Sequence, residues 1–306
     1  MNPSIKYLTN DTINRTEWDD WVRSAGNRRI YASSLFLDIF CPRWEALVMG
    51  EGEAFMPLTR NRKFGISYLY QPIFVQQLGL FFRDAGCADH LPLFIEKLSA
   101  SYSFTDIAMN EMNNDQCRTM QCKVMHNYLL RLDKPYESAA GKYNSNTRRN
   151  IIKSERLGTE LRPCFRPDDV VRLFTGHQGK LYPNIRRKNY ERLGSLLDRG
   201  LAEGFVEIKS ACRHDGRVIA FACMLKDYDR YVFYFSANTA EGREHAAMFL
   251  LVDHFIRQYS GTGMLLDFNG SMNPNLARFY SGFGAEKTYY PRLRINNLRY
   301  PFRLFK

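Results

Sequence analysis

The stretch DFNGSMNPNLARFYSGFGAEKTYY, residues 267–290, places polar side chains directly after an apolar, strand-like run. The carboxylate of Asp267 could orient an amine or accept its proton. The side chains of Asn269 and Ser271 could hydrogen-bond a substrate amide. The stretch is therefore a candidate catalytic turn.

An architectural role explains many residues of the same stretch. Asn273 or Ser271 can cap a helix, Pro274 suits its first turn, and Gly282 and Gly284 can end it. The turn either faces a substrate or is a capped strand-to-helix connection, and the residue types leave both open.

A second group of candidate residues is basic. Arg148, Arg149 and Lys153 lie in the segment YNSNTRRNIIKSERLG, residues 143–158. At helical spacing, Arg149, Lys153 and Arg156 share one face. Arginine guanidinium groups bind phosphate oxygens bidentately, so this row predicts a phosphate-binding surface. A solvated helix face is the alternative.

Positive charge is concentrated in the second half of the chain. Residues 1–133 carry 14 Lys and Arg against 15 Asp and Glu, whereas residues 134–306 carry 29 against 17. The second half also contains a basic cluster flanked by tyrosines: Tyr182, Arg186, Arg187, Lys188 and Tyr190. This asymmetry predicts an anionic, phosphate-containing partner.

Composition limits the class of protein. The 306 residues are 45% hydrophobic and 25% charged, which is typical of a globular protein. No apolar run is long enough to span a membrane, and the first residues lack the apolar segment of a secretory signal. We therefore expect a cytoplasmic protein without membrane insertion. Cys117 and Cys122 have no matching second pair and the six histidines are scattered, so we expect reduced thiols and no metal site.

Helical and strand-like patterns alternate along the chain. The first half predicts helices at 16–25, 33–40 and 90–102, and strand-like runs at 44–49, 53–60 and 66–82. The second half predicts helices at 136–157, 167–178, 188–203 and 244–260, and strands at 205–213, 217–227 and 230–238. Asp215-Gly216 predicts a hairpin turn. Asp133-Lys134-Pro135 interrupts the pattern and predicts a domain boundary.

The element order of the second half resembles the GNAT acyltransferase core: three antiparallel strands, a helix, a strand, a helix and a final strand. ARFYSGFGA, residues 277–285, is similar to the GNAT pattern in which a helix ending in tyrosine precedes Gly-Phe and the last strands. Together with YNSNTRRNIIKSERLG and with FVQQLG, residues 74–79, it makes the chain resemble the FemABX-type branch, which includes peptidoglycan aminoacyltransferases. The resemblance implies an α/β (α+β) fold with two tandem GNAT-like domains, residues 1–135 and 136–306, each with a mixed, mostly antiparallel sheet.

The resemblance leaves two acyl donors open. In GNAT enzymes a Gly-rich, basic loop before the main helix holds the pyrophosphate of coenzyme A. The matching loop here, residues 236–249, keeps Gly242 and Arg243, but Glu241 and Glu244 flank them. Carboxylates near a pyrophosphate are electrostatically unfavourable. FemABX-type proteins take aminoacyl-tRNA instead, so the co-substrate is acyl-CoA or aminoacyl-tRNA, and tRNA is a candidate partner.

The resemblance also assigns roles to individual residues. Tyr280 matches the GNAT tyrosine that often protonates the leaving group. A basic residue of the helix that contains Arg148 and Arg149 contacts the phosphates of a nucleotide-linked substrate in FemABX-type proteins. Strands of the GNAT fold splay next to the acyl donor. We therefore expect the turn after Asp267 to face that gap, with Asp267 and Tyr280 lining one pocket.

The leading hypothesis is an N-acyl- or aminoacyltransferase that acts on an amine of a cell-envelope precursor or a similar anionic molecule. The first alternative is a catalytically inactive GNAT-like module that binds a phosphate-rich ligand. A second alternative is direct nucleic-acid binding, although the sequence contains no recognised DNA- or RNA-reading motif. The sequence leaves the oligomeric state open.

Overall fold

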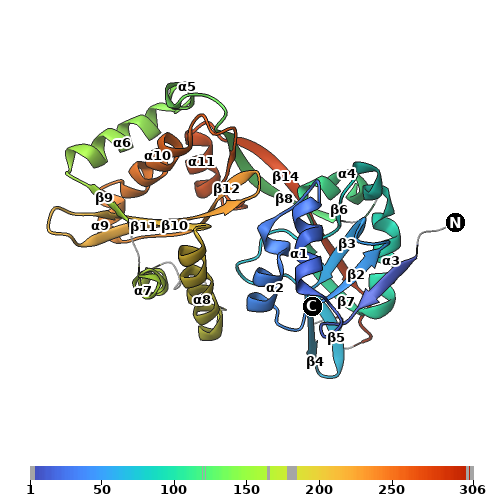
Figure 1. Ribbon diagram of the computed structural model, residues 1–306. Helices are drawn as coiled ribbons and strands as arrows, with labels where there is room; N and C mark the ends of the chain where they lie inside the picture. Colours follow the sequence, from blue (N-terminus) through green and yellow to red (C-terminus); the bar gives the residue numbers. More distant parts are fainter. Residues whose placement is uncertain are drawn as a thin grey trace. The chain divides into compact units, whose positions relative to one another are not determined.

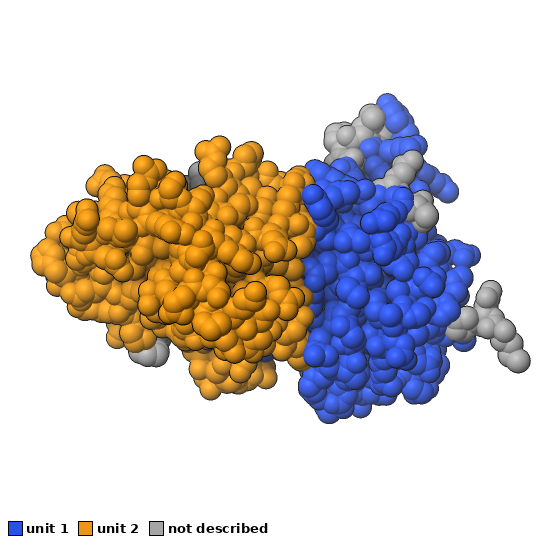
Figure 2. Space-filling model, turned by 90° about the horizontal axis from the view of Figure 1, so that it is seen from above, with its two compact units in different colours: residues 1–125, 289–306 blue, residues 126–288 orange. Residues whose placement is uncertain are grey.

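The computed structural model describes residues 4–118, 120, 122–163, 166–177, 185–300 and 303. Cys164 and Tyr182 lie outside the described residues. The chain forms two compact units, residues 1–125 with 289–306 and residues 126–288 (Figure 2). This division differs from the expected 1–135 and 136–306, because the C-terminal residues return to the first unit. The expected α/β fold with mixed, mostly antiparallel sheets is confirmed.

The first unit contains two sets of strands. One sheet is antiparallel, in the order β1 (Ile5–Leu8), β2 (Glu45–Met49), β3 (Ala54–Leu58) and β6 (Phe81–Phe82). The other set has the order β4 (Arg60–Lys63), β5 (Ile66–Tyr70), β7 (Phe104–Ala108) and β14 (Glu286–Asn296). In that set only β5 and β7 run parallel. The expected run 66–82 is therefore two short strands separated by a loop.

The described part of the first unit also contains four α-helices: α1 (Arg15–Ser24), α2 (Ser34–Phe40), α3 (Leu91–Ser101) and α4 (Asn114–Cys117). The side chain of Asn14 caps α1 by accepting hydrogen bonds from the backbone N–H groups of Thr16 and Glu17. Trp18 of α1 packs against the rings of Trp44 and Phe55. The buried side of this helix carries Trp18, Trp21 and Val22.

The second unit is built on one sheet. Its order is β8 (Cys122–Arg131), β13 (Leu265–Asp267), β12 (Arg230–Asn238), β11 (Val218–Asp227), β10 (Val206–Cys212) and β9 (Glu160–Pro163). β12 and β13 run parallel, and the other described neighbours in this order run antiparallel. Gly216, at a φ of 83°, forms the turn between β10 and β11, so the predicted hairpin is confirmed.

Helices cover both faces of this sheet (Figure 1). One face carries α5 (Tyr136–Gly141), α6 (Ser145–Arg156), α9 (Ala240–Glu244), α10 (Ala247–Tyr259) and α11 (Pro274–Gly282). The other face carries α7 (Pro167–His177) and α8 (Arg187–Glu203). Strand alternation divides β10 in the same way. Lys209 contacts His254 of α10, whereas the neighbouring Ile208 and Ser210 side chains are buried toward the opposite face.

The expected long helix at 136–157 is two helices, α5 and α6. The break lies at Asn144, whose side chain accepts a hydrogen bond of 2.8 Å from the backbone N–H of Thr147. An N-cap residue adopts extended backbone angles, and Asn144 has a ψ of 166°, so the chain must start a new helix there. The same break turns α6 across α10 and α11.

Candidate functional site

β13 pairs with β12 over only three residues. Arg230, Tyr231 and Val232 of β12 lie opposite Leu265, Leu266 and Asp267. β12 then continues to Asn238, whereas the chain after Asp267 stays with β8, since Phe268 N–H donates to the carbonyl of Tyr128. The two parallel strands therefore part after Val232 and Asp267. We refer to this end of the β12–β13 pairing as the splay.

Asp267 ends β13 as a buried ion-pair partner. Its carboxylate lies 3.0 Å from the guanidinium of Arg230, the first residue of β12. The other carboxylate oxygen accepts hydrogen bonds from the side chain of Asn127, on β8, and from the backbone N–H of Asn269. Both oxygens are thus engaged, and the side chain is 3% exposed.

Asn269 spans the point where the strands part. Its backbone φ is 59°, in the left-handed region that asparagine tolerates better than most residues. Its side-chain amide donates a hydrogen bond of 3.2 Å to the carbonyl of Tyr234, on β12. Asn269 therefore joins the chain after β13 to the part of β12 that has lost its strand partner. Burial raises the pKa of the Tyr234 phenol well above its usual range.

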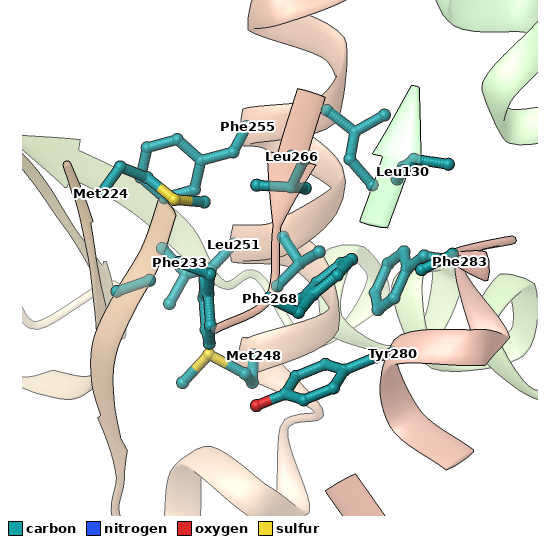
Figure 3. Close-up of a cluster of buried hydrophobic side chains, with 14 of the residues drawn as sticks. Leu130, Met224, Phe233, Met248, Leu251, Phe255, Leu266, Phe268, Tyr280 and Phe283 are labelled. Carbon is teal, nitrogen blue, oxygen red and sulfur yellow. The ribbon is translucent and has the colours of Figure 1, made fainter. Parts of the chain in front are cut away.

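Tyr280 lies in the hydrophobic core next to this splay (Figure 3). Its ring stacks on Phe268 with 4.6 Å between the ring centroids, and it also contacts Phe233 and Tyr128. Figure 3 shows its hydroxyl group at the end of the cluster near Met248, which belongs to the first turn of α10. Tyr280 is 6% exposed.

Asp267 and Tyr280 lie on different sides of the chain at residues 266–268. The side chains of Leu266 and Phe268 belong to the same core cluster as Tyr280, so strand alternation directs Asp267 the other way, toward Arg230. The expectation that both residues line one pocket is not met by this arrangement. The reason is that β12 supplies the partner for the buried carboxylate, which the turn itself lacks.

The candidate donor loop forms α9 and the start of α10. Thr239 caps α9 by accepting a hydrogen bond of 2.9 Å from the backbone N–H of Gly242. A Cβ atom on Gly242 would lie 2.2 Å from the carbonyl oxygen of Ile219 and from the side-chain oxygen of Asn238. Gly242 therefore allows α9 to lie against β11. The side chain of Arg243 donates to the carbonyl of Asn238.

The carboxylate of Glu241 has cationic partners. It accepts hydrogen bonds of 2.7 Å from Arg213 and 3.1 Å from Arg217. Its charge is thus offset locally, which weakens the electrostatic objection to an anion near this loop. α10 begins after Ala246, which has a φ of 53° and provides no side-chain cap.

The basic candidates of the α6 and α8 segments do not form one surface. Arg148 donates hydrogen bonds to the carbonyls of Gly141 and Tyr143, and so holds the end of α5 to the start of α6. Arg149 and Lys153 are exposed on α6. The remaining three, Arg186, Arg187 and Lys188, lie at the start of α8, on the other face of the sheet (Figure 1). Arg187 pairs with Glu191.

Two cavities of the second unit lie beside α7. One, of about 430 Å³, is lined by Val170, Leu173, Ser210 and Phe221 among others. The other, of about 670 Å³, lies between α7 and α8. Neither is lined by Asp267, Asn269 or Tyr280. Among the described residues, no group of three or more His, Cys, Asp or Glu side chains could hold a metal ion. No described helix is both long and apolar enough to cross a membrane.

Comparison with known proteins agrees with this geometry. The family described as acetyltransferase (GNAT) domain matches residues 141–274. The match covers less than half of the chain, and we refer to the matched residues as the GNAT domain. The GNAT domain contains α6, the α9–α10 loop, the splay of β12 and β13, and Asn269. The activity class of this domain family is acyl transfer. No curated protein matches the chain.

Two solved structures extend the likeness beyond the GNAT domain. The structure of FemX matches this chain with a TM-score of 0.64 and 11% sequence identity. The match covers 94% of this chain and 96% of FemX. L-PGS from Bacillus licheniformis has a TM-score of 0.56 and 10% identity, over 95% of each chain. At these identities the likeness concerns the fold. The resemblance to GNAT proteins of the FemABX type is confirmed at that level.

Arg230 and Asn127 have no role in the sequence-based interpretation. Arg230 lies 37 residues before Asp267, and Asn127 lies 140 residues before it. The only signal was a charged residue at the first position of an otherwise apolar strand, RYVFYFSAN. Such a position is common at strand ends, so sequence alone does not identify the ion pair.

Proposed function

We propose that this protein transfers an acyl or aminoacyl group to an amine. The observation that carries the proposal is the splay of β12 and β13 in the GNAT domain, next to the start of α10. Parting strands leave backbone groups of β12 without a strand partner, and Asn269 already uses one of them, the carbonyl of Tyr234. An extended donor arm could use the others, in the way that a peptide adds to a sheet edge.

The proposed reaction balances without a redox partner or a metal ion. The amine nitrogen forms a bond to the acyl carbon, and the bond from that carbon to the donor's sulfur or oxygen breaks. The amine gives up one proton, and the leaving thiolate or alkoxide takes one up. We assign that last proton transfer to the hydroxyl group of Tyr280, which lies near the first turn of α10 (Figure 3).

Asp267 and Asn269 have different proposed roles. Asn269 lies at the splay and contacts Tyr234, so it is the candidate to hydrogen-bond the reacting amide. Both carboxylate oxygens of Asp267 are engaged, one of them by the backbone of Asn269. We therefore assign Asp267 as a positioning residue that holds Asn269, rather than as the base.

Acyl-CoA and aminoacyl-tRNA both remain candidate donors. The start of α10 favours an anion, because the backbone N–H groups and dipole of a helix N-terminus attract phosphate. Arg243 of α9 precedes this turn, and Glu241 has its own arginine partners. The proposed acceptor is an amine on an anionic molecule such as a cell-envelope precursor. The proposed phosphate contacts lie on two separate surfaces. One surface carries Arg149 with Lys153, and the other carries Arg186 to Lys188.

A donor screen tests the proposal. Coenzyme A or acetyl-CoA that binds only the native state stabilises it by about 2.7 kcal/mol when the free ligand concentration is one hundred times Kd. This stabilisation raises the melting temperature. Aminoacyl-tRNA is tested by transfer of a radiolabelled aminoacyl group to a soluble amine. Arg243→Glu should weaken donor binding, whereas Arg199→Glu, at an exposed position of α8, is the matched control. If no donor binds and none is consumed, the proposed function is wrong.

A second candidate function is a ligand-binding GNAT-like module without catalysis. The observation that favours it is that Asp267 is fully engaged by Arg230, Asn127 and Asn269. This candidate predicts that a donor raises the melting temperature but is never consumed. The transfer assay therefore separates the two functions.

A further inference from the structure

The outer face of α6 combines exposed basic and apolar side chains. Arg149, Ile152, Lys153 and Arg156 follow the i, i+3, i+4, i+7 spacing that brings side chains onto one helix face. Leu157, at the C-cap, adds a second apolar side chain at the end of the row. Ile152 is 46% exposed and Leu157 is 47% exposed. We refer to these five residues as the α6 face.

The opposite side of α6 is already used by the GNAT domain. Thr147 and Ser154 are buried there, and Ile151 packs against the hydrophobic core. The fit is close at Gly282 of α11, where an added Cβ would lie 2.5 Å from the hydroxyl oxygen of Thr147. Figure 1 shows α6 as the outermost helix over α10. The α6 face is therefore directed away from the core of its unit.

The charge of the α6 face selects an anionic partner. Its three basic residues have a single acidic neighbour on the helix, Glu155, which lies toward one side of the row. Arg156 and Lys153 also lie in the last turn, near the negative end of the helix dipole, where a cation is stabilised. The fold therefore holds these charges in place whether or not a partner is bound.

The apolar residues distinguish between anionic partners. A soluble phosphate compound or a nucleic acid would use the basic residues and leave the Ile152 and Leu157 side chains in water. An anionic lipid surface uses both kinds, because basic side chains contact the headgroup phosphates while apolar side chains enter the boundary between headgroups and acyl chains. The alternation of the two kinds along one face favours the lipid surface.

We propose that the α6 face docks this protein on an anionic lipid surface. The proposal deepens the proposed phosphate contact of Arg149 and Lys153, on which it rests, by naming lipid headgroups as the source of the phosphate. It does not require that acyl transfer takes place. Docking through one helix face is weak and reversible, and it depends on salt because the charges are exposed.

Vesicle sedimentation with the full chain tests the proposal. Wild-type protein should bind vesicles that contain phosphatidylglycerol in phosphatidylcholine, but not vesicles of phosphatidylcholine alone, and should be released at about 0.5 M salt. Each basic residue near an anionic surface strengthens binding by about fivefold. Arg149→Glu with Lys153→Glu should therefore weaken binding by at least about 25-fold. Ile152→Ser with Leu157→Ser should weaken it by about fivefold or more without a change in charge.

The matched control reverses two charges on the other face of the sheet. Arg172→Glu with Arg199→Glu, at exposed positions of α7 and α8, changes the net charge equally and should leave vesicle binding within about twofold of wild type. Equal loss in this control would show a general charge effect and overturn the proposal. So would absence of binding to anionic vesicles.

A soluble polyanion distinguishes lipid docking from nucleic-acid binding. If Arg149→Glu with Lys153→Glu abolishes binding to a single-stranded RNA while Ile152→Ser with Leu157→Ser leaves vesicle binding unchanged, the face binds nucleic acid and the lipid proposal is wrong. Donor binding and transfer to a soluble amine are measured without vesicles. Failure of the docking proposal is therefore distinct from failure of the proposed function.

Discussion

The carboxylate of Asp267 and the guanidinium of Arg230 lie 3.0 Å apart, and each side chain is 3% exposed. The pair links the first residue of β12 to the last residue of β13, at opposite ends of their short parallel register. Arg230 has a second carboxylate partner, Asp229, which is 47% exposed. Asp267 has no second cationic partner among its described contacts.

This asymmetry predicts unequal effects of removing the two charges. Arg230→Met leaves Asp267 as a buried charge without a cation, which should lower the free energy of unfolding by about 3–5 kcal/mol. Asp267→Asn leaves Arg230 with Asp229 and should lower it by about 1–3 kcal/mol. Urea unfolding of both variants measures the difference. An equal or larger loss for Asp267→Asn would contradict the assignment of Asp229 as a second partner.

Asn269 provides a test of backbone strain at the splay. Asn269→Ala and Asn269→Gly both remove the hydrogen bond to the carbonyl of Tyr234. The backbone at this position is left-handed, with a φ of 59°. This conformation costs an L-residue such as alanine about 1–2 kcal/mol, but glycine adopts it readily. Asn269→Gly should therefore be the more stable variant by about 1 kcal/mol in thermal or urea unfolding. If acyl transfer needs the amide, both variants lose turnover, whatever their stability.

Gly242 and Gly194 form a matched pair of helix glycines. Gly242→Ala places a Cβ 2.2 Å from the carbonyl oxygen of Ile219, so it should destabilise the chain by about 1–3 kcal/mol through overpacking. A Cβ on Gly194, in α8, would have no atom within 4 Å. Gly194→Ala should therefore stabilise the chain by up to about 1 kcal/mol, as alanine does in a helix. Equal effects in urea unfolding would show that α9 does not lie closely on β11.

His254 predicts a pH dependence of stability. Burial, followed by the nearby charge of Lys209, lowers the pKa of His254 below its usual value, and Glu207 and Asp253 oppose this shift. In the unfolded chain histidine titrates near its ordinary pKa of about 6.5. The unfolded state therefore binds a proton first, and the stability contributed by neutral His254 is present above that pH and falls as the pH drops below it.

The measurement compares melting temperatures between about pH 7.5 and pH 5.5. Wild type should lose more stability than His254→Gln over this range. His214→Gln, at an exposed turn position, is the control and should follow wild type. A wild-type slope that His254→Gln leaves unchanged would assign the pH dependence to other groups.

Sequence patterns predicted those elements of the second unit that depend on neighbouring residues in the sequence. The strands β10, β11 and β12 follow from alternating residues and from Asp215-Gly216, because turn and register are encoded within a few residues. The short edge strand β9, with the sequence ELRP, was not predicted, since four mixed residues carry little periodicity. The division of 136–157 into two helices depended on one capping asparagine within a helix-like pattern.

The site was less predictable because its contacts are distant in sequence. Local strand alternation identifies the segment in which the strands part. It also places the Asp267 and Phe268 side chains on opposite faces of the chain. The direction of the Asp267 carboxylate depends on Arg230 and Asn127, which other strands supply. The separation of Arg149 from Arg186 depends on which face of the sheet each helix covers (Figure 1). Neither relationship has a signature in the spacing of residues.

The return of the C-terminal residues to the first unit has a consequence for synthesis. Residues 126–288 are continuous, so the second unit is complete once residue 288 has left the ribosome. The first unit must wait for β14, because residues 292–296 pair with β7. The N-terminal half of the chain should therefore be the last part to acquire its final structure. Ribosome-bound chains arrested with residue 288 exposed should protect only residues 126–288 from proteolysis, and protection of the first 125 residues at that stage would contradict this order.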